Sequence, residues 1–178
     1  MKTYATSIDL KTYLKCVQFS HDSIETNLDE YLKRNQDNPH KILNDIIVGK
    51  IAEFGVYQIL KEKYDISEPD LNVYCKNDKS YDSDLKTDLY DIHIKSQTID
   101  QSKIFGKSWS FQKKDSLVHN PSDRDYIVLC LVNSLNVTIM HKGLAKNYLK
   151  IYEQPISPML REKKTVLYYD TIIDNWKK

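Results

Sequence analysis

The chain has 178 residues and a mass of 20.9 kDa, which suits one globular domain. Its hydrophobic fraction of 40% can fill a core, and its short apolar runs exclude a transmembrane helix. The net charge is only +1, although residues 1–100 carry 13 basic and 18 acidic side chains and residues 101–178 carry 13 and 7. Cys16, Cys75 and Cys130 form no CxxC pair, which argues against a disulfide framework or a structural zinc site. Without an apolar signal core near its start, we expect the protein to be cytoplasmic and to have no membrane partner.

The first part of the chain predicts helices. Helix-like apolar spacing covers about residues 3–19 and 23–34. Ser23 is a suitable N-cap for the second of these helices. The dipeptide Asn38-Pro39 is typical of an N-cap followed by proline at the first helical position, and it predicts a long amphipathic helix that reaches about residue 64.

Beyond Pro69 the hydrophobic period changes from that of helices to that of strands. The expected strands are 71–75, 82–85, 90–97, 126–132 and 136–140, followed by a short helix at 143–152 and a strand or mixed segment at 165–173. The segment at 126–132, YIVLCLV, is nearly all apolar, as expected for a central strand buried on both faces. We expect a single domain with an N-terminal helical element (1–37), a core (38–140) and a C-terminal helix and strand (141–178).

The long predicted helix carries a carboxylate on its apolar side. Glu53 follows Ile46 by seven residues and projects from the same stripe. A buried carboxylate is strongly disfavoured unless it gains a partner, a proton or a metal ion. Alternatively, Glu53 lies at the edge of the stripe and pairs with Lys50. Gly49 and Gly55 flank it, and because glycine inside a helix costs about 1 kcal/mol relative to alanine, we expect close packing against a sheet or a backbone there.

The predicted strand at 90–97 has patterned polar residues. By two-residue alternation one face carries Asp91, His93, Lys95 and Gln97, and the other carries Ile92 and Ile94. A hairpin would bring Asp84 back to the same place as Lys95. Metal-assisted hydrolysis needs a carboxylate that holds a divalent cation and a lysine that orients water or stabilises charge on a phosphate. The alternative is an ordinary amphipathic strand with a solvated outer face.

In this order, these residues resemble the PD-(D/E)XK nuclease superfamily. The resemblance covers the stretch from Glu53 to Val132. Gly49-Lys-Ile-Ala-Glu53-Phe-Gly55 matches the first-helix glutamate, Asp84 the hairpin aspartate, His93-Ile-Lys95-Ser-Gln97 the strand motif, and YIVLCLV a later core strand. The sequence departs from the family at His93, where the usual residue is Asp or Glu.

The resemblance implies an α/β fold with a restriction-endonuclease-like mixed central β-sheet, flanked by helices and preceded by a helical segment. The implied catalytic residues are Glu53, Asp84, His93, Lys95 and Gln97. The implied cofactor is Mg²⁺, with Mn²⁺ as an alternative, held by Asp84, Glu53 and His93. Asp82 and Asp88 are rivals for the place of Asp84, and Asp91 is a rival for that of His93.

A basic and aromatic segment follows this strand. The candidate contacts to DNA phosphates are Lys103, Lys107, Lys113 and Lys114, and Arg124 is a candidate reader of guanine. They are interleaved with Phe105, Trp109 and Phe111, which would pack behind the lysines or against bases. The alternative is that these aromatic residues belong to the core.

The expected function is a divalent-metal-dependent endonuclease that hydrolyses DNA phosphodiester bonds, such as a site-specific restriction or homing endonuclease. Its partner would be double-stranded DNA, and a homodimer or higher homo-oligomer would present one site to each strand. Alternatives are a repair or recombination nuclease, and a non-catalytic domain of the same fold that binds nucleic acid or protein. A third alternative is an α/β domain whose patterned strand is only surface.

Overall fold

The computed structural model describes residues 4–33, 38–74 and 83–177. The strands are β1 (Tyr4–Ser7), β2 (Leu85–Lys86), β3 (Asp91–Thr98), β4 (Ser108–Gln112), β5 (Asp125–Asn133), β6 (Asn136–Leu144) and β7 (Lys164–Tyr168). The α-helices are α1 (Leu10–Leu32), α2 (Pro39–Leu60), α3 (Ile99–Phe105), α4 (Ser116–His119) and α5 (Tyr169–Trp176). Two short 3₁₀ helices are η1 (Ala145–Tyr148) and η2 (Pro158–Leu160).

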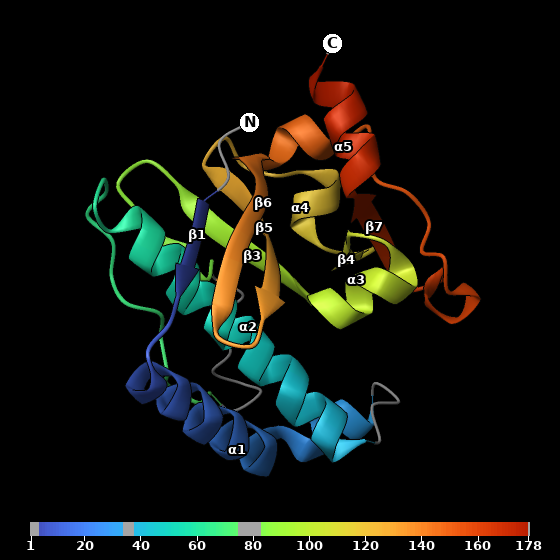
Figure 1. Ribbon diagram of the computed structural model, residues 1–178. Helices are drawn as coiled ribbons and strands as arrows, with labels where there is room; N and C mark the ends of the chain where they lie inside the picture. The colour runs from blue at the N-terminus through green and yellow to red at the C-terminus, as the bar shows by residue number, and fades with distance from the viewer. Residues whose placement is uncertain (1–3, 34–37, 75–82, 178) are drawn as a thin grey trace.

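Five strands form a mixed sheet in the order β1-β6-β5-β3-β2 (Figure 1). β3 and β5 run parallel, and the other neighbours are antiparallel. β5 is the middle strand, and residues 127–132 are all buried, which confirms the prediction of a central strand for YIVLCLV. β4 and β7 form a separate antiparallel ribbon. The mixed α/β class expected from the sequence is therefore observed.

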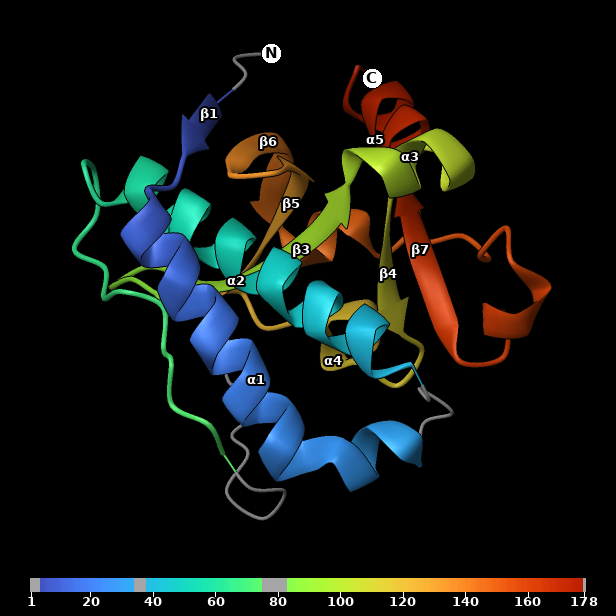
Figure 2. The ribbon, with the colours of Figure 1, turned by 60° about the horizontal axis from the view of Figure 1, so that its bottom comes forward.

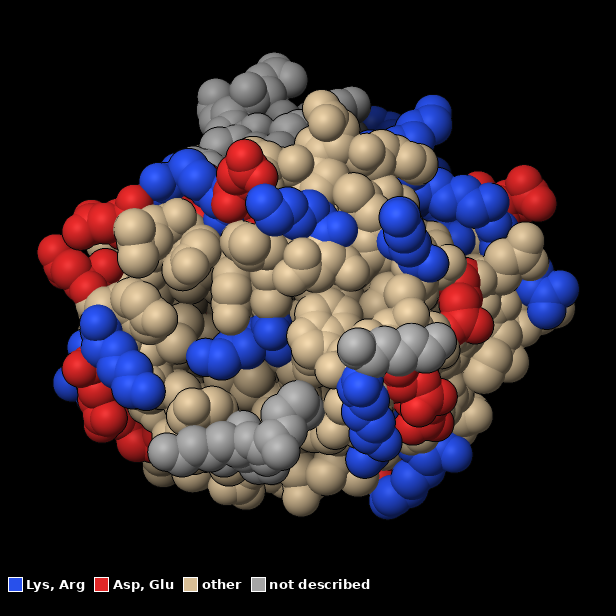
Figure 3. All heavy atoms as spheres, turned by 90° about the horizontal axis from the view of Figure 1, so that it is seen from above, with Lys and Arg blue, Asp and Glu red and all other residues tan. Residues whose placement is uncertain are grey.

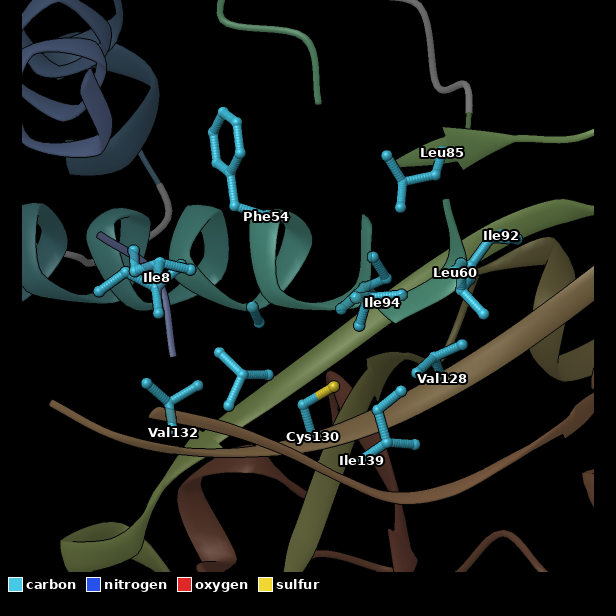
Figure 4. Close-up of a cluster of buried hydrophobic side chains, with 14 of the residues drawn as sticks. Ile8, Phe54, Leu60, Leu85, Ile92, Ile94, Val128, Cys130, Val132 and Ile139 are labelled. Atoms are coloured by element: carbon cyan, nitrogen blue, oxygen red, sulfur yellow. The ribbon is translucent and has the colours of Figure 1, made fainter. Parts of the chain in front are cut away.

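Helix α2 lies between α1 and the central sheet (Figures 1 and 2). In Figure 4, side chains of β3, β5 and β6 point toward α2, among them Ile94, Cys130 and Ile139. The close packing expected at Gly55 is confirmed, because a Cβ atom there would lie 2.6 Å from Cβ of Val137. At Gly49 the expectation is wrong, since an added Cβ would meet no atom within 4 Å.

The opposite face of the sheet is covered by the β4–β7 ribbon, η1 and α5. Trp109 and Phe111 are each 1% exposed and pack against Ile127 and Leu129 of β5. The indole Nε1 of Trp109 donates to the carbonyl oxygen of Cys130 at 2.9 Å. These two aromatic residues therefore belong to the core, as the alternative interpretation of the basic and aromatic segment proposed.

The N-terminal elements differ from the expected ones. Residues 4–7 form the edge strand β1, and helix α1 starts only after Asp9, whose side chain accepts a hydrogen bond from the amide of Thr12 at 2.6 Å. Ser23 is not an N-cap, because it is buried inside α1. The two helices that the sequence predicts, at about 3–19 and 23–34, are replaced by one helix, α1, which has a kink at Asn27, where φ is −126°. The Asn27 side-chain amide donates to the carbonyl oxygen of Tyr74 at 3.2 Å.

Helix α2 begins as predicted, because the Asn38 side chain accepts from the amide of Lys41 at 3.0 Å and proline follows it. It ends at Leu60, before the expected residue 64, and Lys61 is its C-cap. Of the helices in the described ranges, none combines the length and the apolar character needed to cross a lipid bilayer.

Three expected segments of the later chain are corrected, and a fourth is divided into two elements. Residues 71–74 form no strand, and Cys75 lies outside the described residues. The strand expected at 82–85 is β2, shifted to Leu85–Lys86. The helix expected at 143–152 is reduced to η1, because β6 continues to Leu144. The mixed segment expected at 165–173 divides into β7 and α5.

Candidate functional site

Glu53 lies on α2 with only 12% of its side chain exposed. Nζ of Lys50, one helical turn earlier, lies 2.7 Å from Oε2 of Glu53. This is the pairing that the stripe-edge interpretation predicts. The lysine does not offset the cost of burial, because burial and the negative charge of Asp84 raise the pKa of Glu53 from 4.5 to about 7. The site therefore holds a carboxyl group whose ionisation is disfavoured by its surroundings.

Asp84 lies at an open edge of β3. β2 pairs with β3 only at Leu85 and Lys86, so the amide of Ile94 has no partner on β2. Oδ2 of Asp84 accepts a hydrogen bond from that amide at 2.6 Å. The Asp84 carboxylate is therefore fixed by backbone, and its charge is close enough to Glu53 to raise the pKa of that residue.

Lys50 connects the carboxylate pair to neighbouring segments. Its Nζ also donates to the backbone carbonyl of Asp70 at 2.9 Å and lies 4.6 Å from the ring centroid of Phe19 on α1. The Asp70 carboxylate accepts from the hydroxyl of Tyr74 at 2.6 Å. Burial raises the pKa of the Cys16 thiol to about 11, and the charge of Glu53 contributes to this shift. Lys50 thus connects the largely buried carboxyl group of Glu53 to the exposed segment at Asp70.

The strand motif lies on the other face of the sheet. Ile92 and Ile94 face α2 and belong to its core cluster, as the two-residue alternation predicts. Nε2 of His93 lies 3.1 Å from Oδ1 of Asp125, and both side chains are less than one-fifth exposed. Nζ of Lys95 lies 5.5 Å from the ring centroid of Phe111. Lys95 and His93 therefore project away from the face on which Glu53 packs.

Gln97 is buried and has both ends of its amide engaged. Nε2 donates to the carbonyl oxygen of Gly106 at 3.0 Å, and Oε1 accepts from the amide of Ser108 at 3.0 Å. These bonds tie the end of β3 to the beginning of β4. In this arrangement Gln97 connects two elements of the fold.

Of the rival aspartates, the two that the structure describes, Asp88 and Asp91, contact Arg124. Asp91 pairs with Arg124, whose Nε lies 3.2 Å from Oδ2 of Asp91. Arg124 also donates to the carbonyl oxygens of Asp88 and Thr87 at 2.8 and 3.2 Å. Arg124 therefore holds the turn before β3. Asp82 lies outside the described residues.

The lysines expected to contact DNA are distributed over separate loops and one helix. Nζ of Lys103 on α3 lies 2.8 Å from Oδ1 of Asp100. Nζ of Lys107 lies 5.2 Å from the ring centroid of Tyr169. Lys113 and Lys114 follow β4 and are exposed, and the carbonyl oxygen of Lys113 is bonded by Nε2 of His119. The described contacts do not join these lysines into one cluster.

Two members of the site were not among the expected catalytic residues. Lys50 could be found from its spacing of three residues before Glu53, which places both on one side of a helix. Asp70 carries no such signal, because its backbone carbonyl makes the contact and any residue has a carbonyl group.

The carboxylate pair suits a hard divalent cation. Mg²⁺ commonly binds through one or two protein carboxylates and completes its shell with water and substrate phosphate. Within residues 4–33, 38–74 and 83–177, no three His, Cys, Asp or Glu side chains gather as a metal-binding group. A cation at this place would therefore have Glu53 and Asp84 as its carboxylate ligands and would take the rest of its shell from water or substrate. Comparisons with protein-family models, curated proteins and solved structures find no match to this chain.

Proposed function

We propose that this chain is a divalent-metal-dependent endonuclease that hydrolyses DNA phosphodiester bonds. The observation that carries the proposal is that the largely buried Glu53 interacts electrostatically with Asp84: burial and the charge of Asp84 raise the pKa of Glu53 to about 7. A divalent cation would relieve this repulsion, since carboxylates that disfavour ionisation side by side become favourable ligands when a cation lies between them. Mg²⁺, or Mn²⁺ in its place, is the proposed cofactor.

Each residue of the site has a defined task in this proposal. Glu53 and Asp84 would hold the cation, which supplies Lewis-acid polarisation of the phosphodiester and a more acidic water. The hydrogen bond from the amide of Ile94 fixes Asp84 without using its second oxygen. Lys50 balances the charge of Glu53 before substrate binds, and its ammonium group can donate to a non-bridging phosphate oxygen.

The order of elements also supports the proposal. The helix with Glu53 precedes a short antiparallel pair, β2 and β3, and β5 then runs parallel to β3. The proposed fold type is restriction-endonuclease-like, with double-stranded DNA as substrate. A homodimer would offer one carboxylate pair to each strand, as a restriction, homing or repair nuclease needs.

A second candidate is a domain of this fold that binds nucleic acid or protein without catalysis. The observation that favours it is the engagement of the strand motif elsewhere. His93 is bonded to Asp125, and Lys95 lies over the ring of Phe111. Under this proposal Glu53 and Lys50 form only a structural ion pair.

The deciding experiment is cleavage of supercoiled plasmid DNA with Mg²⁺ or Mn²⁺ by the wild type, Glu53→Gln and Asp84→Asn. The matched control is Asp45→Asn, which removes a carboxylate from the exposed, Lys41-paired side of the same helix. The proposal expects metal-dependent nicking or linearisation by the wild type and the control, and at least about 100-fold slower cutting by the two site variants. Undiminished cutting by Glu53→Gln and Asp84→Asn would overturn the assignment of the site. A wild type that binds plasmid without cutting it would favour the second candidate.

A further inference from the structure

An aromatic cleft lies at the end of the molecule where β1 and α5 meet the sheet. It has a volume of about 330 Å³ and is lined by side chains from β1, β5, β6 and α5, among them Tyr4, Tyr126, Lys142 and Trp176. Figure 3 shows the molecule from above, where Lys and Arg and Asp and Glu side chains are interspersed with uncharged residues. Among the described residues that line the cleft there is no carboxylate, so its wall combines aromatic rings with positive charge.

Trp176 is held in place although it is 40% exposed. Its ring centroid lies 4.5 Å from that of His141, nearly perpendicular, and 5.1 Å from that of Tyr148. His141 and Tyr148 are themselves buried and joined by a hydrogen bond of 2.8 Å from the hydroxyl to Nδ1. Burial lowers the pKa of His141, so the ring is neutral and adds no charge to the cleft. The indole is therefore a rigid platform that needs little ordering when a flat ligand stacks on it.

Two lysines lie beside Tyr4, and one of them, Lys142, lines the cleft. Nζ of Lys142 lies 5.0 Å from the ring centroid of Tyr4, and Nζ of Lys63 lies 5.8 Å from the same centroid. A cationic ligand would be repelled by two ammonium groups beside the ring, which excludes the use of this aromatic cleft as a cage for methylated amines. An anionic group is attracted at the same place. The favoured ligand thus combines a flat ring with negative charge.

Tyr126, which lines the cleft, has its ring centroid 4.9 Å from that of Tyr90, the residue before β3. Both tyrosines are partly buried and pack against the core cluster. An exposed aromatic ring with an ammonium group nearby is an arrangement that binds an unpaired base, because the base stacks on the ring while its phosphate meets the ammonium group. A duplex cannot use it in this way, because its bases are already stacked on one another.

We propose that this cleft binds a single strand of nucleic acid, with a base stacked on Trp176 and phosphates beside Lys142 and Lys63. The site is separate from the Glu53–Asp84 pair, and the proposal goes beyond the proposed nuclease activity without depending on it. It gives the chain a place for a strand displaced from a duplex or left single-stranded.

The test is the fluorescence anisotropy of a short labelled oligodeoxythymidine, titrated with protein in EDTA so that no metal-dependent cleavage occurs. Trp176→Leu and Lys142→Gln should each weaken binding about 5- to 100-fold, which corresponds to the loss of one stacked base or of a phosphate contact. The matched controls are Phe105→Leu, an exposed aromatic residue on α3, and Lys146→Gln, an exposed lysine four residues after Lys142. Both controls should bind like the wild type.

Tryptophan fluorescence gives a second readout of stacking. The chain has two tryptophans, and Trp109 is only 1% exposed, so a base that stacks in the cleft should quench Trp176 alone. The oligonucleotide should quench the wild type and Lys146→Gln, and leave the fluorescence of Trp176→Leu unchanged. Because Trp176→Leu alters packing near His141, Lys142→Gln provides an independent test on a surface side chain.

Three results would overturn the proposal: tighter binding of the matched duplex than of the single strand, equal binding of an abasic strand, or unchanged affinity in both cleft variants. An oligouridine arm distinguishes DNA from RNA as the preferred strand. Failure here is distinguishable from failure of the proposed function. Glu53→Gln should still bind the single strand like the wild type. A protein that cuts plasmid DNA, but whose Trp176 fluorescence is not quenched by the oligonucleotide, would refute only single-strand binding in the cleft.

Discussion

Glu53 and Lys95 lie on opposite faces of the central sheet. α2 places Glu53 on the face to which Ile94 points, whereas Nζ of Lys95 lies 5.5 Å from the ring centroid of Phe111 in the other core cluster. The ammonium group that contacts Glu53 is instead that of Lys50, at 2.7 Å. Any role of a lysine at the carboxylate pair therefore belongs first to Lys50.

Replacement of these two lysines should have different effects on cleavage. Lys50→Met should slow metal-dependent plasmid nicking by about 100-fold or more, because it removes a charged donor from the site where charge develops. Lys95→Met should slow it by less than about tenfold. Initial rates at equal protein concentration measure the difference, with circular dichroism to verify folding. A greater loss in Lys95→Met than in Lys50→Met would contradict this arrangement.

The raised pKa of Glu53 predicts a pH dependence of stability. An acid whose pKa rises on folding from 4.5 to about 7 destabilises the folded state as it ionises, so the penalty is absent below pH 4.5 and complete above about pH 7. Glu53→Gln lacks this ionisation. The free energy of unfolding of Glu53→Gln, relative to that of the wild type, should therefore increase as pH rises through this window, by at most about 3 kcal/mol.

Urea denaturation in EDTA at several pH values between 4 and 8 measures this gain. Asp84→Asn serves as a companion variant, because it removes one of the causes that raise the pKa of Glu53. The pH range over which ionisation of Glu53 destabilises the fold should end at a lower pH in Asp84→Asn than in the wild type. A constant difference between Glu53→Gln and the wild type across the whole range would show that Glu53 titrates normally.

Metal binding should stabilise the fold. A cation that binds only the folded state adds about 2.7 kcal/mol when its concentration is 100 times the Kd. Mg²⁺ or Mn²⁺ should therefore raise the Tm of the wild type and of Asp45→Asn, and leave that of Asp84→Asn nearly unchanged. An equal rise in Tm for Asp84→Asn and the wild type would place the bound cation elsewhere.

Two glycines of α2 should respond to alanine with opposite signs. Gly55→Ala places a Cβ 2.6 Å from Cβ of Val137 and should destabilise the fold by about 1–3 kcal/mol through overpacking. Gly49→Ala meets no atom within 4 Å and should stabilise it by up to about 1 kcal/mol, because alanine has the higher helix propensity. Thermal and urea denaturation of the two variants provide matched measurements, and destabilisation by Gly49→Ala would contradict this packing.

The elements predicted best from the sequence are those with strong local signals. The Asn38-Pro39 cap fixes the start of α2, and the apolar run over 127–132 identifies the central strand. Ser23 misled because a serine before an apolar repeat also fits inside a kinked helix, where tertiary burial takes precedence over capping preference. β1 was not predicted because its four residues are stabilised as a strand by pairing with β6, which is far away in the sequence.

The candidate site was predictable only within single elements. Alternation correctly separated Ile92 and Ile94 from His93 and Lys95, since it depends on the pleat of one strand. Long-range packing decides which face of β3 is covered by α2, and no local sequence pattern predicts that choice. For this reason the carboxylate of Glu53 could be recognised, while its arrangement relative to Lys95 could not.

The pairing of β1 with β6 has a consequence for the order of folding. Tyr4 pairs with Ile139, whereas β5 and β6 are joined by a tight turn at Ser134, where φ is 53°. The hairpin needs little loop closure, but β1 must close a loop that contains most of the chain, so it is expected to join the sheet last. A proline at Thr6 should accordingly speed unfolding and leave the refolding rate nearly unchanged.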